Sequence, residues 1–438
     1  MRPLQHLTFE AYRDLLGAQF RQVPDERDPQ RIIWKLHDVL MSGFAMFFFQ
    51  HPNLLQFQQR MKQERGQSNL QRLFGVRGVP SETQMRELLD TPAALEPLRR
   101  VLPQVFEQMR KTGWTSRLVT EVNGTNYYTV ALDGSQYFNS TRIECPHCLQ
   151  RKDKSGEVHY SHVVVGATLV RAGSHTILPL DAEEVRNTDG QEKQDCELNA
   201  GKRLIERLRQ EHRQLSLIVT GDDLYSHEPL ILELRNLRMN FVLVAKPSSH
   251  AELYEWVEDL DRLGQCGKGA WEEGPLAKRR SFQYRIARQV PLTQSDQVRV
   301  NFVEVWERNK SGKVVYHNAW VTDFEVTPEN AATIVGTGRA RWKIENEQFN
   351  VQKNHGYELE HNYGHGQRGL SLVFYLLNLL AFVAHQVLEL GDRLYQVCRA
   401  RESRRSIWEQ LRVFFDRLEF ARWEALLRFH LNEPAPDS

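Results

Sequence analysis

Apolar and polar residues follow helical spacing in the first part of the chain. In the first 120 residues apolar side chains recur at intervals of three and four, as in Ile33, Leu36 and Leu40, and strand-like alternation is scarce. This spacing predicts amphipathic helices, because it places apolar side chains on one helical face. We therefore expect a helical N-terminal region over residues 1–120.

The pattern changes to strands near Asn126. β-branched and aromatic residues fill three successive runs, and a turn at residues 171–174 joins the last two as a hairpin. Strand-like and helical segments then alternate. The predicted order is β-β-β-α-β-α-β, with strands at 127–133, 159–170, 175–180, 215–220 and 240–245 and helices at 194–212 and 229–237.

This order predicts an α/β fold with a mixed sheet and flanking helices. Strand–helix–strand units impose parallel pairing and bring the loops that follow the strands to one edge of the sheet. A ribonuclease-H-like sheet has this order of elements, and in it the first and fourth strands are neighbours. We therefore expect a ribonuclease-H-like sheet.

Residues 248–327 fit neither a helical period nor the preceding alternation. Two β-rich runs, 297–308 and 313–324, flank a turn that is typical of a hairpin. This segment predicts a β-rich insertion. We expect five regions: the helical N-terminal region (1–120), the first part of the α/β domain (121–247), the β-rich insertion (248–327), the helical completion of the α/β domain with C-terminal helices (328–432) and a disordered tail (433–438).

Two carboxylates follow strands of the predicted sheet. Asp133 ends the first strand and precedes Gly134. The alternative is that Asp133 is simply an aspartate at an ordinary strand-to-turn junction. Asp222 and Asp223 follow the fourth strand. The Asp-x-x-Tyr spacing to Tyr225 and the place directly after the strand favour Asp222, whereas Asp223 would cap the following turn. Neighbouring strands would place Asp133 and Asp222 side by side.

The third acid lies on a helix, where Arg341 and Glu345 are one turn apart. At 100° per residue, Glu345 lies about 40° from Phe349 and about 60° from Trp342, whereas Glu347 lies about 160° from Phe349. A helix that packs Trp342 and Phe349 on the sheet would hold Glu345 at the edge of its buried face. We favour Glu345, although Glu347 remains the alternative.

Three carboxylates at one sheet edge predict a site for divalent cations. Hard cations such as Mg²⁺ prefer oxygen ligands and usually take one or two protein carboxylates per ion. Two ions about 3.5–4 Å apart can activate a nucleophilic oxygen and stabilise a leaving oxygen at a phosphodiester. We therefore expect a two-ion Mg²⁺ site at Asp133, Asp222 and Glu345, in which Mn²⁺ can substitute.

At these residues the chain resembles the DDE transposases of bacterial insertion sequences, in the branch with a β-rich insertion before the final glutamate. The family places its metal-binding catalytic acids at the positions matched by Asp133, Asp222 and Glu345. The resemblance covers roughly residues 130–366 and rests on residues 132–138, 219–225, 341–350 and 355–366.

The family also commonly shows the pattern Tyr-x2-Arg-x3-Glu-x6-Lys, which this chain matches in part. Arg341 and the favoured glutamate fit, Gly338 takes the Tyr position, and Gln352 takes the Lys position with Lys353 one residue later. Arg341 could contact a DNA phosphate or form an i,i+4 pair with the glutamate. The candidates for DNA contact are Tyr225, Arg341 and Lys353.

The resemblance implies an enzyme, a DDE polynucleotidyl transferase that cleaves DNA and joins the freed ends to target DNA during DNA transposition. Its partner would be double-stranded DNA, both element ends and target, bound by a homodimer or larger complex. The helical N-terminal region could bind DNA or pack against the rest. Two alternatives stay open, namely a ribonuclease-H-like endonuclease without strand transfer and a catalytically inactive DNA-binding protein.

A second group of candidate ligands lies just after the first strand. Cys145 and Cys148 form a CxxC pair, which in a reducing compartment predicts zinc or redox chemistry. A tetrahedral zinc site would need two further ligands. The alternative is a pair of free thiols, and residues 361–366 are interpreted as a glycine-rich loop with solvated imidazoles. The candidates for the further ligands are His147, His159, His162 and Cys196.

Composition gives further limits on partners and location. The 57 Lys and Arg residues balance 56 Asp and Glu residues, so binding of a polyanion would rest on local clusters. Five cysteines and no leader pattern at the start predict a cytoplasmic protein. The apolar segment 370–390 approaches the ~20 residues of a membrane span, but it carries Asn378 and His385. We expect a buried helix and no membrane partner.

Overall fold

The computed structural model describes residues 8–187, 196–275 and 279–432. The predicted disordered tail, residues 433–438, lies outside the described residues. The first two residues of the helix expected at 194–212 lie outside them too.

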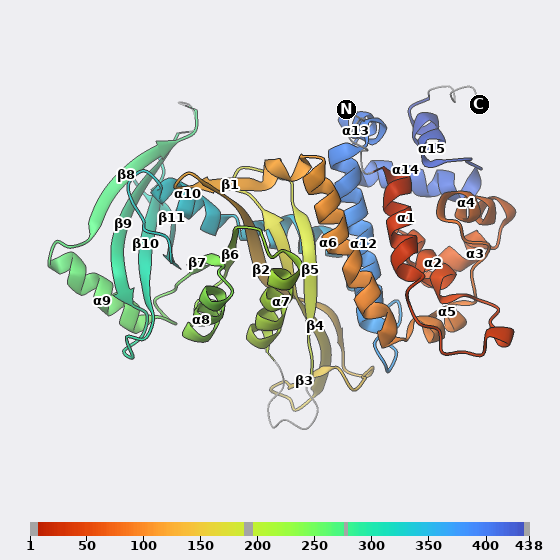
Figure 1. Cartoon of the computed structure of the whole chain (residues 1–438), viewed down its shortest axis with the longest axis horizontal. Coiled ribbons are helices and arrows are strands. Elements are labelled where there is room, and N and C mark those ends of the chain that lie inside the picture. The colour runs from red at the N-terminus through yellow and green to blue at the C-terminus, as the bar shows by residue number, and fades with distance from the viewer. Residues whose placement is uncertain (1–7, 188–195, 276–278, 433–438) are drawn as a thin grey trace.

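In the described part of the chain eleven strands form one mixed sheet, which extends from one end of the molecule to its centre, so the predicted α/β fold is confirmed (Figure 1). The strand order is β3-β4-β2-β6-β7-β11-β10-β9-β8, and β1 pairs with β2 and β5 with β4. The strands are β1 (Val119–Val122), β2 (Thr125–Ser140), β3 (Leu149–Lys152), β4 (Val158–Val170), β5 (Leu178–Val185), β6 (Leu217–Gly221), β7 (Asn240–Val244), β8 (Gly267–Glu273), β9 (Arg280–Pro291), β10 (Arg299–Arg308) and β11 (Val314–Thr322).

Helices cover the sheet and form a separate layer at one end of it (Figure 1). The helices are α1 (Phe9–Phe20), α2 (Leu36–Phe48), α3 (Leu54–Met61), α4 (Glu64–Phe74), α5 (Glu82–Leu89), α6 (Leu95–Lys111), α7 (Glu197–Glu211), α8 (Glu228–Asn236), α9 (Ala251–Arg262), α10 (Ala331–Arg339), α11 (Asn350–Asn354), α12 (Leu370–Gly391), α13 (Arg393–Arg401), α14 (Arg404–Arg417) and α15 (Trp423–His430). Shorter turns are η1 (Pro29–Arg31), η2 (Pro92–Ala94), η3 (Trp114–Leu118) and the π-helical η5 (Ile344–Phe349).

The central strands pair as the sequence predicts. β2 runs parallel to β6, with Val130 beside Val219 and Ala131 beside Thr220, and β6 runs parallel to β7. β4 and β5 add to the other side of β2 as antiparallel strands. The resulting order β5-β4-β2-β6-β7 is that of a ribonuclease-H-like sheet, with the first and fourth predicted strands as neighbours.

The β-rich insertion continues this sheet. β11 pairs antiparallel with β7, and β8 to β11 follow as an antiparallel ribbon, with the predicted hairpin between β10 and β11. The segment also contains a helix, α9, that the sequence pattern failed to predict. Only Leu253 and Val257 of α9 are buried, so its apolar stripe is too narrow to show a helical period.

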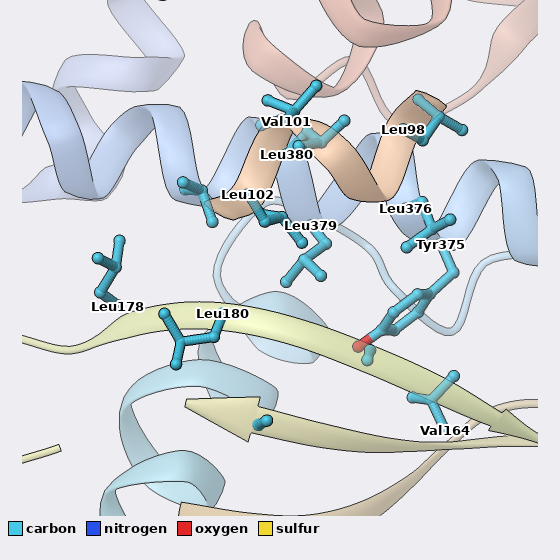
Figure 2. Packing of buried hydrophobic residues seen from close by; sticks show 14 of the residues in the cluster. Leu98, Val101, Leu102, Val164, Leu178, Leu180, Tyr375, Leu376, Leu379 and Leu380 are labelled. Carbon is cyan, nitrogen blue, oxygen red and sulfur yellow. The ribbon is translucent and has the colours of Figure 1, made fainter. Parts of the chain in front are cut away.

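The N-terminal helices pack against the rest of the chain. Helix α2 is almost entirely buried, and α2 and α6 both contact α12. Figure 2 shows apolar residues of α6 and α12 meeting residues of β5 and β4, including Leu102, Leu379 and Leu180. The N-terminal region was expected either to bind DNA or to pack against the rest of the chain, and the structure shows the packing. Ile33, assigned to a helical face from its spacing, is 80% exposed and precedes α2, so its assignment is wrong.

Helix α12 is long and apolar enough to cross a membrane by length and composition, yet its apolar part is buried inside the protein. Its polar residues have internal partners. Asn378 donates to the Tyr357 carbonyl at 2.8 Å, and the buried His385 ring bonds the Phe48 carbonyl and the Tyr357 hydroxyl. This helix is the centre of the helical layer, as the polar residues within its apolar run led us to expect.

A buried asparagine links α4 to the C-terminal helices. The Asn69 amide nitrogen donates to the carbonyls of Phe415 at 2.7 Å and Leu418 at 2.5 Å, and its oxygen accepts from the Phe420 amide at 2.8 Å. Asn69 is fully buried. Its side chain therefore satisfies three backbone groups at the end of α14, where no helical partner is available.

Replacing Asn69 with Leu should lower the stability by about 2–4 kcal/mol, because buried backbone groups would lose their partners. The measurement is the urea midpoint followed by tryptophan fluorescence. Gln71→Leu, on an exposed position of the same helix, is the matched control and should leave the midpoint nearly unchanged. An unchanged midpoint in Asn69→Leu would contradict this account.

Candidate active site at the centre of the sheet

The parallel register of β2 and β6 places two aspartates side by side. Ala131 pairs with Thr220, so Asp133 and Asp222 are each two residues further along and lie at the same level. Neighbouring strands are about 4.8 Å apart, which keeps the two carboxylates close. Asp133 does not end its strand as predicted, because β2 continues to Ser140 and pairs Asp133 with Gly166 of β4.

The structure distinguishes Asp222 from Asp223. Asp222 follows β6 directly, accepts a hydrogen bond from the Leu224 amide at 3.1 Å and lines the same pocket as Asp133. Asp223 instead pairs with Lys246 at 2.5 Å and accepts from Ser249 at 2.9 Å. The expectation that Asp223 caps the turn is therefore wrong, since Asp222 bonds the turn and Asp223 belongs to a separate ion pair.

Glu345 reaches the pocket from a π-helical turn that packs on β2 and β4. Within η5, the side chains of Ile344 and Phe349 are buried, and a Cβ at Gly166 would lie 2.9 Å from the Phe349 ring. The missing side chain at Gly166 thus lets η5 approach the strand that pairs with Asp133. Gln348, also buried, accepts a hydrogen bond from Thr168 of β4.

The α-helical arrangement expected for residues 342–349 is wrong in part. Trp342 is 49% exposed and does not pack on the sheet, and a π-turn does not advance 100° per residue. Glu345 nevertheless lines the pocket with the two aspartates. The Glu347 carboxylate lies 3.2 Å from the His175 ring, outside that pocket.

The π-turn also accounts for the late lysine. A π-turn contains one residue more than an α-turn. Lys353, eight residues after Glu345, therefore points in the direction that a residue seven positions after Glu345 would have in a regular α-helix. Lys353 lines the pocket with Glu345 and pairs with Glu360 at 2.9 Å. Gln352, at the position where the family pattern has Lys, is fully buried and donates to Asn378.

Two cations face the acids. Arg341 Nη1 lies 3.2 Å from Asp133 Oδ2, with both side chains mostly buried, so its observed partner is Asp133 and not the i,i+4 glutamate. Lys353 contributes the second positive charge. The pocket is lined by Asp133, Gly134, Ser135, Gln136, Asp222, Arg341, Glu345, Phe349, Asn350 and Lys353.

The acids repel one another in the protein without metal. The pKa of Asp133 is raised to about 6, first by burial and also by the charges of Asp222 and Glu345, while Arg341 acts in the opposite direction. One arginine therefore does not balance the negative charge. Carboxylate oxygens with excess negative charge are the ligands that hard divalent cations prefer, so the residues present fit Mg²⁺.

A fourth carboxylate, Glu197, was not predicted from the sequence. It lies in the first turn of α7, and a Cβ at Gly134 would collide with its side chain. Burial and the charges of Asp133 and Asp222 raise the pKa of Glu197. The sequence signal was a glutamate in the first turn of a helix, which is common because such positions face the helix dipole. Only the fold reveals its place beside Asp133.

Tyr225 does not lie where a DNA contact would need it. Its ring is fully buried, and Cβ atoms at Gly201 and Gly221 would lie 3.0 and 2.8 Å from it. The prediction that Tyr225 contacts DNA is therefore wrong for this structure. The ring supports the loop that carries Asp222 from behind.

The CxxC cysteines have two histidine neighbours. The Cys145, Cys148, His162 and His365 ligand atoms all lie within 4.8 Å of one another. His162 was among the predicted candidates, whereas His365 was not. The loop of residues 361–366 was expected to carry solvated imidazoles, but His365 is buried. The other candidates lie outside this group, with the His159 ring 3.5 Å from Asp153 and Cys196 exposed before α7.

Comparison with known proteins adds little. No protein-family model matches the chain, and no curated protein matches it. Among solved structures, the crystal structure of the NurA nuclease from Sulfolobus solfataricus is similar to this chain at 10% sequence identity, over 72% of this chain and 99% of that chain, with a TM-score of 0.22. A likeness this weak carries no argument about function.

Magnesium should stabilise the protein in a manner that depends on Asp133 and on pH. Folding raises the pKa of Asp133 to about 6, so the protonated Asp133 favours the folded state at low pH. This stabilisation is complete below about pH 4 and is lost as the pH rises through about 6. Its loss lowers the free energy of unfolding by up to about 3 kcal/mol when no metal is bound. Mg²⁺ needs the ionised carboxylate, so the rise in melting temperature on adding Mg²⁺ should be full at pH 8 and fade below pH 6.

Asp133→Asn should show no Mg²⁺-dependent rise at any pH, and without metal it should lose less stability than the wild type between about pH 4 and 6. Thermal melts across pH 4 to 8, with and without Mg²⁺, test both statements. The variant Asp223→Asn is the control that should keep the magnesium response. A magnesium response in Asp133→Asn equal to that of the wild type would refute the assignment.

Proposed function

We propose that the protein is a DDE transposase, an enzyme that cleaves DNA strands and joins the freed ends to target DNA. The observation that carries the proposal is the meeting of Asp133, Asp222 and Glu345, from three distant parts of the chain, in one pocket with Arg341 and Lys353. The parallel register of β2 and β6 and the π-turn of η5 bring them together. The sequence resemblance assigns metal-binding roles to the same three acids.

The three carboxylates would hold two Mg²⁺ ions, which would supply activation of the attacking oxygen and stabilisation of the leaving oxygen at a phosphodiester. Asp133 pairs with Arg341 at 3.2 Å and lines the pocket with the other two acids, so it would be one of the metal ligands. Glu197, behind Gly134, would orient Asp133 and hold the local charge negative. Because the pKa of Asp133 is raised to about 6, metal binding there would be favoured at a pH where its carboxyl is ionised.

The surroundings of the acids favour nucleic acid as the substrate. Arg341 and Lys353 are placed to contact phosphate oxygens, and Arg341 also lies 5.5 Å from the centre of the Trp342 ring. Trp342 is 49% exposed beside Arg341, so a base could stack on it. Cations at an acidic pocket, one of them beside an exposed aromatic ring, are suited to a nucleotide chain.

The remaining assignments follow from the same proposal. The partner would be double-stranded DNA, at the element ends and at the target, bound by a homodimer or larger complex in the cytoplasm. A ribonuclease-H-like nuclease is the second candidate, because the same acids would serve cleavage without joining. Neither assignment depends on a membrane.

Glu345→Gln and Asp133→Asn should each reduce Mg²⁺-dependent cleavage by on the order of 10²-fold or more, since each removes a direct metal ligand. DNA binding, measured by mobility shift, should stay near that of the wild type. Glu347→Gln is the matched control two residues away and should cleave normally. The substrate is linear DNA carrying the sequences that flank the coding region. Full cleavage by Glu345→Gln with loss in Glu347→Gln would reverse the assignment.

Precut DNA ends with a free 3′-hydroxyl separate a transposase from a nuclease. The wild-type protein with Mg²⁺ should join such ends to a plasmid target, and Asp133→Asn should not. Cleavage of uncut DNA without joining of precut ends would favour the nuclease. Binding with neither activity would favour a catalytically inactive DNA-binding protein.

A further inference from the structure

Four soft or borderline metal ligands from distant parts of the chain meet beside the catalytic sheet. Cys145 and Cys148 lie in the loop between β2 and β3, His162 is on β4, and His365 is in the loop between α11 and α12. Cys148 and His365 are 217 residues apart in sequence, yet Sγ and Nε2 are 3.3 Å apart. Two thiols and two imidazoles are the ligand set of structural zinc sites.

The distances match a tetrahedral zinc site. With Zn–S of about 2.3 Å and Zn–N of about 2.0–2.1 Å, two sulfurs are about 3.8 Å apart and a sulfur and a nitrogen about 3.5 Å apart. The two sulfurs here are 3.8 Å apart, and the His162 nitrogen lies 3.4 Å from Cys145 and 3.6 Å from Cys148. All three edges agree with a tetrahedron, and 3.8 Å is far longer than a disulfide bond.

The surroundings orient the ligands. The other ring nitrogen of His162 lies 3.0 Å from the Glu184 carboxylate, which also accepts a hydrogen bond from the Tyr137 hydroxyl at 3.2 Å. A carboxylate on the far nitrogen fixes the histidine ring so that Nε2 faces the metal, as in known zinc sites. Cys148, His162 and His365 are buried, where polar groups without partners would be costly.

We propose that these four side chains bind a structural Zn²⁺ ion that fastens the loop after α11 to β2 and β4. The loop's other side is already held by the N-terminal helices, since Arg86 donates to the Tyr363 carbonyl at 2.8 Å and Asp90 accepts from backbone amides at residues 367, 368 and 370. Zinc completes this attachment on the side that faces the sheet.

The zinc link acts on the candidate active site through chain connection. The segment from Glu345 to Lys353 leads directly into the loop that carries His365, and Asp133 lies on β2, the strand that leads into the cysteine loop. Zinc therefore holds the third carboxylate in position against the first. This consequence rests on the proposed function, whereas zinc binding itself does not.

Zinc content tests the site in the full-length protein. Wild-type protein, purified without added metal or chelator, should contain about one zinc ion per chain by mass spectrometry of the metals. His365→Gln and Cys145→Ser should lose most of it. The matched controls His361→Gln, an exposed histidine of the same loop, and Cys266→Ser should keep it. Wild-type protein without zinc, or variants that keep a full equivalent, would overturn the proposal.

Cobalt binding keeps the test decisive if the ligand variants do not fold. Wild-type protein produced with Co²⁺ in place of zinc should show the visible absorption of tetrahedral cobalt and the near-ultraviolet band of cobalt–thiolate bonds. Added Zn²⁺ should remove both. The absence of these bands, in protein that carries cobalt, would refute a site with two thiolates.

The effect on the active site is measured separately. A zinc-selective chelator, with Mg²⁺ then restored, should lower cleavage by about tenfold and lower the affinity for Mg²⁺ in thermal melts. Zinc bound stoichiometrically by a protein that never cleaves DNA would leave the zinc site standing and overturn the proposed function. Full cleavage by zinc-free protein would instead overturn the link between zinc and the third carboxylate.

Discussion

The parallel pairing of β2 with β6 is the constraint on which the candidate active site depends. It fixes Ala131 beside Thr220. Asp133 and Asp222 each lie two residues further along their chains, so they are level with each other. A shift of one residue would turn one carboxylate to the opposite face of the sheet, because side chains alternate along a strand. Buried valines on both strands hold this register, so the stability of the core also positions the acids.

The acids are held together against their own repulsion. Burial raises the pKa of Asp133, Arg341 opposes this, and the nearby acids add to it. Such an arrangement persists when surrounding packing determines it, here through Phe349 and Ile344 over Gly166. Strained groups of like charge are typical of functional sites, and the packing that supports them extends into α12 and the N-terminal helices.

The helical layer has a structural part in this arrangement. Helix α12 follows the loop that carries His365 and is surrounded by helices from both ends of the chain. Because α12 is buried along its length, the segment before it has little freedom. The N-terminal helices thus pack on the helix that follows this segment, and none of their described side chains lines the pocket.

The sequence by itself determined the order of the central strands and indicated the three acids, because strand periodicity and the residues at strand ends are local features. It also marked residues whose place only the tertiary structure decided. Trp342 is exposed and Tyr225 is buried, contrary to prediction, because packing partners far along the chain set their burial.

Glu197 and His365 were missed for the same reason, since each meets its neighbours across a long stretch of sequence. The one-residue offset of Lys353 is explained by the π-turn that packs on β2 and β4, which the sequence pattern did not predict. Local spacing thus specified which elements form. The long-range packing of the sheet and the helical layer decided which side chains meet.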